Sequence, residues 1–340
     1  MARFILGHRL RALGERHGAV EAVLYRLDRA FFGTLLWLIR RLPVDTASRL
    51  GARIGAALGP RFRKGRALDD NLRLALPDRS EDERKRIARQ AWGNAGAVFA
   101  EYAHLDEIAF GENGARIAVE VLGDIRTFRD PAHPAVFVTA HQANWEVTAA
   151  AIARQGVPLA VVYSPPTNPL LDELLNRWRT RIGCELLARD ESMRPMLQAL
   201  RNGTSVGIVM DRRVDSGKDV ALFGHPKSTT LVPARLALRH GFDLVPIRVE
   251  RLQDARFRVS FHPPVAVPGG GDEIARAIGM TESLHALFEQ WIREHPGDWF
   301  PSKRLWPKSA YAVRRGRVRN NDAAPTPPAN PSPPRELTDG

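Results

Sequence analysis

The segment Ala135-Val-Phe-Val-Thr-Ala-His-Gln-Ala-Asn-Trp-Glu146 is the part of this 340-residue chain that says most about its fold class. Its first six residues form a short apolar run rich in β-branched and aromatic side chains. The breaker-rich stretch Asp130-Pro-Ala-His-Pro134 precedes it, so a buried strand is predicted. His141 then lies at the strand end, Asn144 can cap a following helix, and Glu146 falls in the first helical turn. Open α/β sheets bind ligands beyond such strand ends.

His141 and Glu146 are the residues of this segment that can carry chemistry. A neutral imidazole can take a proton from a hydroxyl, and a carboxylate on its other nitrogen fixes the tautomer and stabilises the imidazolium. A strand, a turn and a helix start can bring two such side chains together. The alternative is a structural histidine at a strand end and an acid favoured at a helix N-terminus. Taken alone, the spacing favours this structural alternative, so the rest of the chain has to decide.

Beyond Glu146 the sequence alternates between strand and helix patterns. We expect strands at 157–163, 205–210, 243–250 and 256–262, and helices at 168–181, 192–201, 232–240 and 274–293. This alternation predicts an α/β fold with a mainly parallel central sheet covered by helices on both faces. The strand at 256–262 is expected near an edge, and a polar, glycine-containing loop is expected at 220–230. A capping box, Ser80-Glu-Asp-Glu83, opens a helix to residue 105 with a break near Gly93.

The N-terminal region is basic and apolar, and helices are expected at 20–41 and 45–58. The apolar run Ala30–Ile39 is too short for a bilayer, which needs about 20 residues. Flanking arginines and the ring of Trp37 suit a membrane interface, although an ordinary buried helix is the alternative. We therefore expect a membrane-associating helical region at 1–60, an α/β domain at 61–317 and a disordered proline-rich tail at 318–340.

The composition limits the possible partners. The chain has 50 Lys and Arg against 38 Asp and Glu, a formal charge of +12, which favours an anionic membrane or an acidic protein. Nucleic acid is disfavoured because aromatic residues do not interleave with basic ones and zinc-finger motifs are lacking. One cysteine, Cys184, excludes an intramolecular disulfide and suits a reducing, cytoplasmic location. The sequence has no HExxH, Walker or dinucleotide glycine motif, so neither a metal nor a nucleotide cofactor is predicted.

Several further blocks follow in a fixed order. They are Tyr163-Ser-Pro-Pro-Thr-Asn-Pro-Leu-Leu-Asp172, Gly207-Ile-Val-Met-Asp-Arg-Arg213, Phe223-Gly224, Thr229-Thr230 and the closing Pro296-Gly-Asp-Trp-Phe-Pro-Ser-Lys-Arg-Leu-Trp306. Together with His141–Glu146 as an HxxxxE motif, this series resembles the bacterial lipid A biosynthesis late acyltransferases, the lauroyl and myristoyl transferases, within the lysophospholipid acyltransferase superfamily. The resemblance spans roughly residues 30 to 310. Arg212 departs from it, because the family often has glutamine there.

The resemblance implies an O-acyltransferase at the cytoplasmic face of the bacterial inner membrane, bound peripherally or monotopically. Its donor would be an acyl thioester on acyl carrier protein, and its acceptor a hydroxyl of a lipid A precursor. His141 would be the general base oriented by Glu146, with no metal and no cofactor. Backbone N–H groups after Ala143 would serve the oxyanion, and Arg177 or Arg181 the oxyanion or an acceptor phosphate. The implied substrate-binding residues are Asn144, Arg177, Arg181, Asp211, Phe223, Gly224, Thr230 and Arg304.

Three alternatives stay open at the level of sequence. The same chemistry could act on another glycolipid, such as a phosphatidylinositol mannoside, or on a lysophospholipid. The absence of a GxxFxxR-type motif weakens the lysophospholipid option. A noncatalytic membrane-binding relative with the same fold is the third alternative.

Overall fold

The computed structural model describes residues 18–111, 115–130, 132–189 and 193–314. The expected tail at 318–340 and the first 17 residues of the expected N-terminal region lie outside the described residues.

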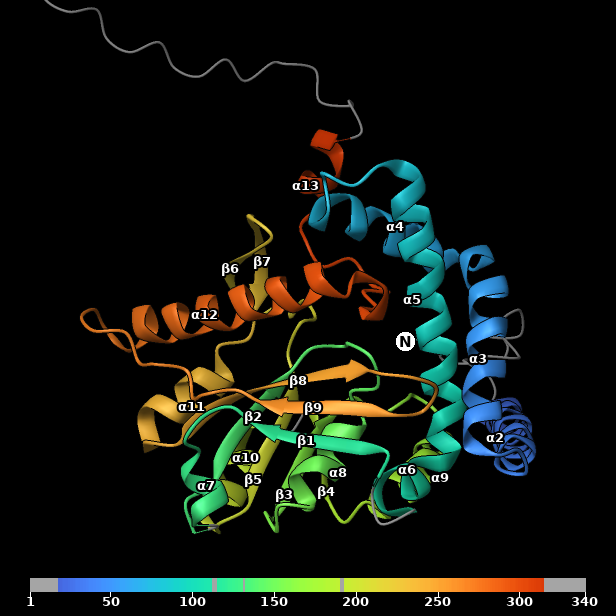
Figure 1. Cartoon of the computed structure of the whole chain (residues 1–340), viewed down its shortest axis with the longest axis horizontal. Coiled ribbons are helices and arrows are strands. Elements are labelled where there is room, and N and C mark those ends of the chain that lie inside the picture. Colours follow the sequence, from blue (N-terminus) through green and yellow to red (C-terminus); the bar gives the residue numbers. More distant parts are fainter. Residues whose placement is uncertain (1–17, 112–114, 131, 190–192, 315–340) are drawn as a thin grey trace, which may run out of the picture.

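Helices and strands alternate along most of the described chain (Figure 1). The α-helices are α2 (Gly18–Arg40), α3 (Val44–Leu58), α4 (Arg63–Ala75), α5 (Glu81–Glu101), α6 (Leu105–Phe110), α7 (Arg126–Arg129), α8 (Val147–Ala153), α9 (Pro169–Thr180), α10 (Met193–Arg201), α11 (Val232–His240), α12 (Glu273–Glu294) and α13 (Lys308–Arg314). Short 3₁₀ turns occur at η2 (Gly59–Arg61), η3 (Tyr102–His104) and η6 (Pro296–Asp298). The strands are β1 (Ile117–Val121), β2 (Ala135–Thr139), β3 (Leu159–Tyr163), β4 (Glu185–Ala188), β5 (Ser205–Val209), β6 (Lys218–Leu222), β7 (His225–Thr229), β8 (Asp243–Arg251) and β9 (Phe257–Phe261).

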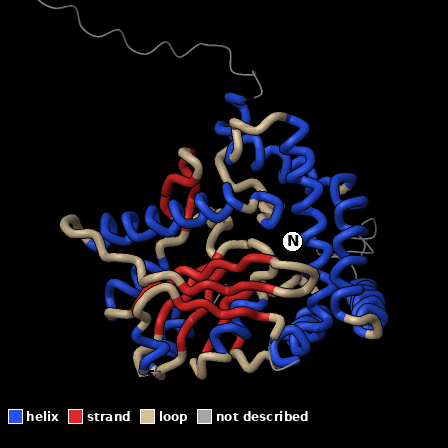
Figure 2. The backbone as a smooth tube through the Cα atoms, viewed as in Figure 1, coloured by secondary structure: helices blue, strands red, loops and turns tan. Residues whose placement is uncertain are grey.

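The main sheet of the described residues has seven strands in the order β1-β9-β8-β2-β5-β3-β4 (Figure 2). Strand β2 lies at its centre and runs parallel to both β5 and β8. Strand β9 is antiparallel to β8 and lies second from the edge. The predicted α/β fold with a mostly parallel sheet is therefore confirmed, and the centre of the sheet is the strand that leads into His141.

Successive residues of β2 belong to different cores because side chains of a strand alternate between its faces. Val136 and Val138 pack in a cluster that includes residues of α11 and α12, whereas Ala135 and Phe137 pack in one that includes residues of α8. Figure 1 shows α11 and α12 on one side of the sheet and α8 on the other. Burial on both faces explains why this strand reads as a continuous apolar run.

Two local expectations are wrong. The expected loop at 220–230 is an antiparallel hairpin of β6 and β7, whose turn residues Phe223 and Gly224 have φ of 53° and 72°. Both values are positive, as in a two-residue hairpin turn of type I′. The sequence did not indicate this turn, because a phenylalanine occupies a position where asparagine, aspartate or glycine is usual. Helix α5 also runs without a break through Gly93, because that face packs against α3. Strand β1 was not expected from the sequence.

Helices α3 and α5 pack closely because glycines face each other at the crossing (Figure 1). A Cβ on Gly51 would lie 2.4 Å from the carbonyl oxygen of Gly96, and one on Gly55 would lie 2.3 Å from that of Trp92. Any larger residue would force the two backbones apart. Among the described helices, none combines the length and apolar character needed to cross a bilayer.

Candidate active site

His141 lies just beyond the end of β2, where its ring contacts a buried carboxylate. Its Nδ1 lies 2.5 Å from Oδ1 of Asp211, which follows β5, the neighbouring parallel strand. The other oxygen of Asp211 accepts a hydrogen bond of 3.0 Å from Nε1 of Trp299. The ring of Trp145 meets the imidazole edge-on at 4.8 Å. Adjacent parallel strands thus bring together a histidine and an acid that are 70 residues apart in sequence.

Asp211 is fully buried and is held as a carboxylate. Burial by itself raises the pKa of Asp211, but the His141 ring, the Trp299 indole and the Lys227 ammonium together hold it well below its usual range. Nζ of Lys227 also lies 3.5, 3.2 and 3.4 Å from the carbonyl oxygens of Met210, Asp211 and Arg212. Burial lowers the pKa of Lys227 to about 8, although Asp211 opposes this. The lysine therefore anchors the backbone that presents Asp211 to His141.

Glu146 has a different partner from the one predicted. Its two oxygens accept hydrogen bonds of 3.0 Å from Nε and 2.7 Å from Nη2 of Arg179, a bidentate pair. Burial lowers the pKa of Arg179, but Glu146 more than offsets this, so the pKa is raised. The acid on the His141 ring is Asp211 and not Glu146. The reason is topological, because a contact between two strand ends leaves no trace in local sequence spacing.

The loop between His141 and Glu146 is tied to α5 and η6. Ala143 has a φ of 44°, uncommon for a residue with a Cβ, and its N–H donates to Asp298 O at 3.0 Å. Asn94 of α5 donates to the carbonyl oxygens of both Ala143 and Asp298, at 2.9 and 3.0 Å. These bonds hold the loop in a conformation that its own sequence does not favour.

Asn144 belongs to this anchoring system. Its Nδ2 donates to Glu101 at 2.9 Å, and its Oδ1 accepts the N–H of Glu146 at 3.1 Å. Glu101 is fully buried and also pairs with Arg251 at 2.5 Å and with Ser48 at 2.6 Å. The cap predicted for Asn144 is wrong, because α8 begins at Val147 with Glu146 as its N-cap and no side chain caps it; the Asn144 side chain instead binds the Glu146 amide ahead of the helix. That amide is therefore not open to an oxyanion, contrary to the expectation for the helix start.

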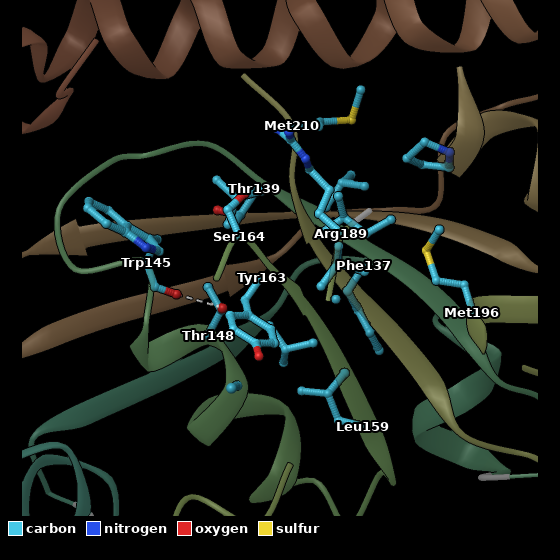
Figure 3. A pocket seen from close by; sticks show the side chains of 18 of the residues that line it. Phe137, Thr139, Trp145, Thr148, Leu159, Tyr163, Ser164, Arg189, Met196 and Met210 are labelled. Atoms are coloured by element: carbon cyan, nitrogen blue, oxygen red, sulfur yellow. Dashed lines mark hydrogen bonds between the residues drawn. The ribbon is translucent and has the colours of Figure 1, made fainter. Parts of the chain in front are cut away.

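A pocket of about 820 Å³ is lined by His141 and by residues of β2, β3, β5 and α8. Figure 3 shows part of this lining. Its walls are mostly apolar and include Phe137, Leu159 and Met196. Glu146 and four arginines also line it, namely Arg179, Arg189, Arg194 and Arg212. A mostly apolar cavity that is lined by a histidine and several cations suits an amphiphilic substrate.

The remaining predicted residues divide into two groups. Thr230 lines the pocket, and its hydroxyl accepts the N–H of Val232 at 3.2 Å. Phe223 and Gly224 form the turn of the β6–β7 hairpin, and Arg304 is exposed over the Tyr311 ring at 5.8 Å. These three residues do not line the pocket.

Arg177 and Arg181 are also not among the lining residues. Arg177 is exposed and pairs with Glu173, whereas Arg181 covers the Trp178 ring and pairs with Asp106 at 3.4 Å. Arg179 faces inward instead, because it continues the i, i+4 series begun by Leu171 and Leu175 on the packed face of α9. The phase of this helix was a signal in the sequence that could have identified Arg179.

A scan against protein families matches residues 21–308 to bacterial lipid A biosynthesis acyltransferases. The chain belongs to this family. It is 30% identical over 258 residues to the lipid A biosynthesis lauroyltransferase of Escherichia coli K12, covering 73% of this chain and 82% of that one. It is also 31% identical over 156 residues to the E. coli myristoyltransferase, covering 46% and 47% of the two chains. The chain is accordingly an acyltransferase of lipid A biosynthesis, as the sequence predicted.

Two more distant likenesses complete the comparison. A phosphatidylinositol mannoside acyltransferase of Mycobacterium tuberculosis is 25% identical over 192 residues, covering 55% of this chain and 58% of that one. The crystal structure of a 1-acyl-sn-glycerophosphate acyltransferase from Thermotoga maritima aligns with a TM-score of 0.35 and 16% identity, covering 72% of this chain and 96% of that one.

Proposed function

We propose that this lipid A acyltransferase moves a fatty acyl group from the thioester of acyl carrier protein to a hydroxyl of a lipid A precursor, with His141 as general base. The observation that carries the proposal is the His141 ring, bound through Nδ1 to a buried carboxylate and lining an apolar pocket. An ionised Asp211 accepts a hydrogen bond from Nδ1–H, which keeps the proton on Nδ1 and leaves the lone pair of Nε2 for catalysis.

The reaction needs two proton movements at Nε2 of His141. The acceptor hydroxyl gives its proton to Nε2 as its oxygen attacks the thioester carbonyl carbon. The tetrahedral intermediate then collapses, the C–S bond breaks, and the departing thiolate takes the proton back. Such general base catalysis contributes roughly 10²- to 10⁴-fold. Asp211 stabilises the imidazolium between the two steps.

The Glu146–Arg179 pair gives the HxxxxE motif a second role in this proposal. Glu146 fixes Arg179 in the wall of the pocket that His141 also lines, and the rings of Tyr102 and Tyr163 lie 5.4 and 5.6 Å from its guanidinium. A cation held there can stabilise the oxyanion of the intermediate. Arg179 takes the place that the sequence suggested for Arg177 or Arg181.

The substrates proposed here match the character of the pocket. The apolar walls suit an acyl chain, whose burial contributes about 0.8 kcal/mol per methylene. A formal charge of +12 suits an acidic carrier protein as the donor. No side chain in this mechanism requires a metal or an organic cofactor.

Membrane attachment is proposed through the exposed apolar side chains of α2 and α3. These are Val23, Leu27, Phe31, Trp37, Leu38, Leu50, Ile54 and Leu58, each at least 45% exposed. Arg41 lies over the Trp37 ring at 4.2 Å, a pairing that suits the headgroup region. Replacing Phe31 and Ile54 by glutamate should reduce co-sedimentation with anionic vesicles. The same change at Val121, 48% exposed on β1, should not, and equal losses would contradict an interfacial role for these helices.

The function is tested by mass spectrometry of lipid A from cells with and without the gene for this chain. The proposal expects one missing acyl group, restored by the wild type and by His133→Ala but not by His141→Ala. His133 is the control because it is an exposed histidine that also pairs with an aspartate. Unchanged lipid A, or restoration by His141→Ala, would refute the proposal. The mycobacterial likeness makes a phosphatidylinositol mannoside the second candidate acceptor, and a purified-enzyme assay with both glycolipids distinguishes the two.

A further inference from the structure

Three arginines line the active-site pocket without a role in the mechanism above, and Arg212 is the most informative of them. It follows Asp211 directly and is half-buried, whereas Arg189 and Arg194 are more exposed. Burial lowers the pKa of Arg212, and the nearby Arg189 lowers it further, although Asp211 opposes both. The positive charges of Arg189 and Arg212 therefore repel each other within one pocket. Figure 3 shows Arg189 among the pocket side chains, with Phe137 and Leu159 below it in the view.

Among the residues that the structure describes, the two acids near Arg212 are already bound to other groups. The carboxylate nearest in sequence, Asp211, uses one oxygen for His141 and the other for Trp299. Both carboxylate oxygens of Glu146 accept hydrogen bonds from the Arg179 guanidinium. Over the part of the chain that the structure describes, the Arg212 guanidinium forms neither a hydrogen bond nor an ion pair, whereas the next residue, Arg213, pairs with Asp215 at 2.9 Å.

A partly dehydrated cation beside a like charge is unfavourable unless an anion accompanies it. Planar guanidinium groups present forked donors that match phosphate oxygens, and this match is strongest where water is partly excluded. Both substrates of the proposed reaction carry phosphate. The lipid acceptor is a phosphorylated sugar lipid, and the arm of the carrier protein contains a phosphodiester.

We propose that Arg212, with Arg189 and Arg194, forms a subsite in the active-site pocket that binds a phosphate group of one of the two substrates. This inference rests on the proposed function for the identity of those substrates. It makes Arg212 a specificity-determining residue of this chain, since a phosphate held there would fix the orientation in which the substrate presents its reacting group to His141.

The test pairs each substrate with a phosphate-free analogue. Acyl transfer by the purified full chain is measured with the lipid acceptor before and after removal of its phosphates, and with acyl carrier protein or acyl-pantetheine as donor. Arg212→Met should raise KM for the phosphate-bearing form of one substrate by about ten- to hundredfold, the range expected for a charge-assisted hydrogen bond. KM for the matching phosphate-free form should not change. The substrate whose KM moves is the source of the phosphate.

Arg212→Lys should restore part of the loss, because lysine keeps the charge but not the fork. Arg213→Met is the control and should behave like the wild type. Equal changes of KM for both forms of both substrates, or no change at all, would overturn the subsite.

Calorimetric binding of the phosphorylated and dephosphorylated acceptor, and of the carrier protein and pantetheine thioesters, provides a readout independent of turnover. A wild type that transfers no acyl group would refute the proposed function. Loss of binding of a phosphate-bearing ligand to Arg212→Met alone would still support the subsite, and unchanged binding of every ligand would refute it.

Discussion

Asp211→Asn is the substitution that most directly tests the histidine–carboxylate pair. The asparagine keeps the shape of the side chain, and its oxygen can still accept from Trp299. Its amide would donate to Nδ1 of His141, a contact that selects the tautomer with hydrogen on Nε2. That tautomer cannot remove a proton from an acceptor hydroxyl.

The magnitude follows from the 2.5 Å contact between His141 and Asp211. Proton transfer makes an imidazolium whose charge centre lies about 4 Å from the carboxylate, and two charges at about that distance interact by about 4 kcal/mol at an effective dielectric constant of about 20. Losing this stabilisation of the transition state corresponds to about 10³-fold in kcat. The wrong tautomer adds to this loss, and a comparable acid-to-amide change beside another catalytic histidine lowers kcat by about 10⁴-fold.

The assay combines kinetics with nitrogen NMR of the imidazole. The Asp211→Asn enzyme should lose about 10³- to 10⁴-fold in kcat, and the protonated nitrogen of His141 should change from Nδ1 to Nε2. Asp215→Asn is the control, because Asp215 is an exposed aspartate on the following loop. A folded Asp211→Asn enzyme within about tenfold of the wild type would refute the reasoning. If the tautomer of His141 changed in Glu146→Gln and not in Asp211→Asn, Glu146 would be the acid that orients the imidazole.

Three further expectations concern the surroundings of the site. Glu146→Gln should lower the free energy of unfolding, measured in urea, by about 3 kcal/mol, because it leaves Arg179 without a counterion. Adding Arg179→Met should recover part of this loss, and strictly additive effects of the two substitutions would contradict the pairing. Gly207→Ala adds a methyl group to the pocket wall, 3.6 Å from Leu159, which is an ordinary contact distance. In competition between acyl donors, the preference should shift toward shorter acyl chains by about fourfold per lost methylene contact. An unchanged preference would mean that the acyl chain lies elsewhere. The pKa of Lys227 is lowered from 10.5 to about 8, so the folded chain releases this proton at lower pH than the unfolded one. Unfolding free energy of the wild type should therefore rise relative to Lys227→Met by about 3 kcal/mol between pH 8 and 10.5, and a difference independent of pH would contradict the burial argument.

Much of the fold followed from periodicity, because strands buried on both faces must be apolar throughout. Strand β2, its parallel neighbours and the helices between them were predicted within a few residues of their observed bounds. The hairpin of β6 and β7 was not, because a phenylalanine with positive φ occupies a turn position where glycine or asparagine is the usual signal. Helix α5 was predicted with a break, because a glycine selected for close packing looks in sequence like a helix breaker.

The sequence alone determined the class of chemistry and supplied the histidine that we propose as the base. A histidine at the end of a buried strand, in an ordered series of family blocks, was sufficient to predict an acyltransferase and to select His141. Only the tertiary structure decided which acid contacts that histidine and which arginine enters the pocket. Asp211 reaches His141 because β2 and β5 are adjacent parallel strands, and Glu146 instead holds Arg179 because of the phase of α9. Local spacing does not record the contact of His141 with Asp211, since hydrogen bonds between strand ends depend on the order of the strands in the sheet. The i, i+4 phase of α9 indicates that Arg179 faces inward, but only the packing of that helix against the sheet shows that it meets Glu146.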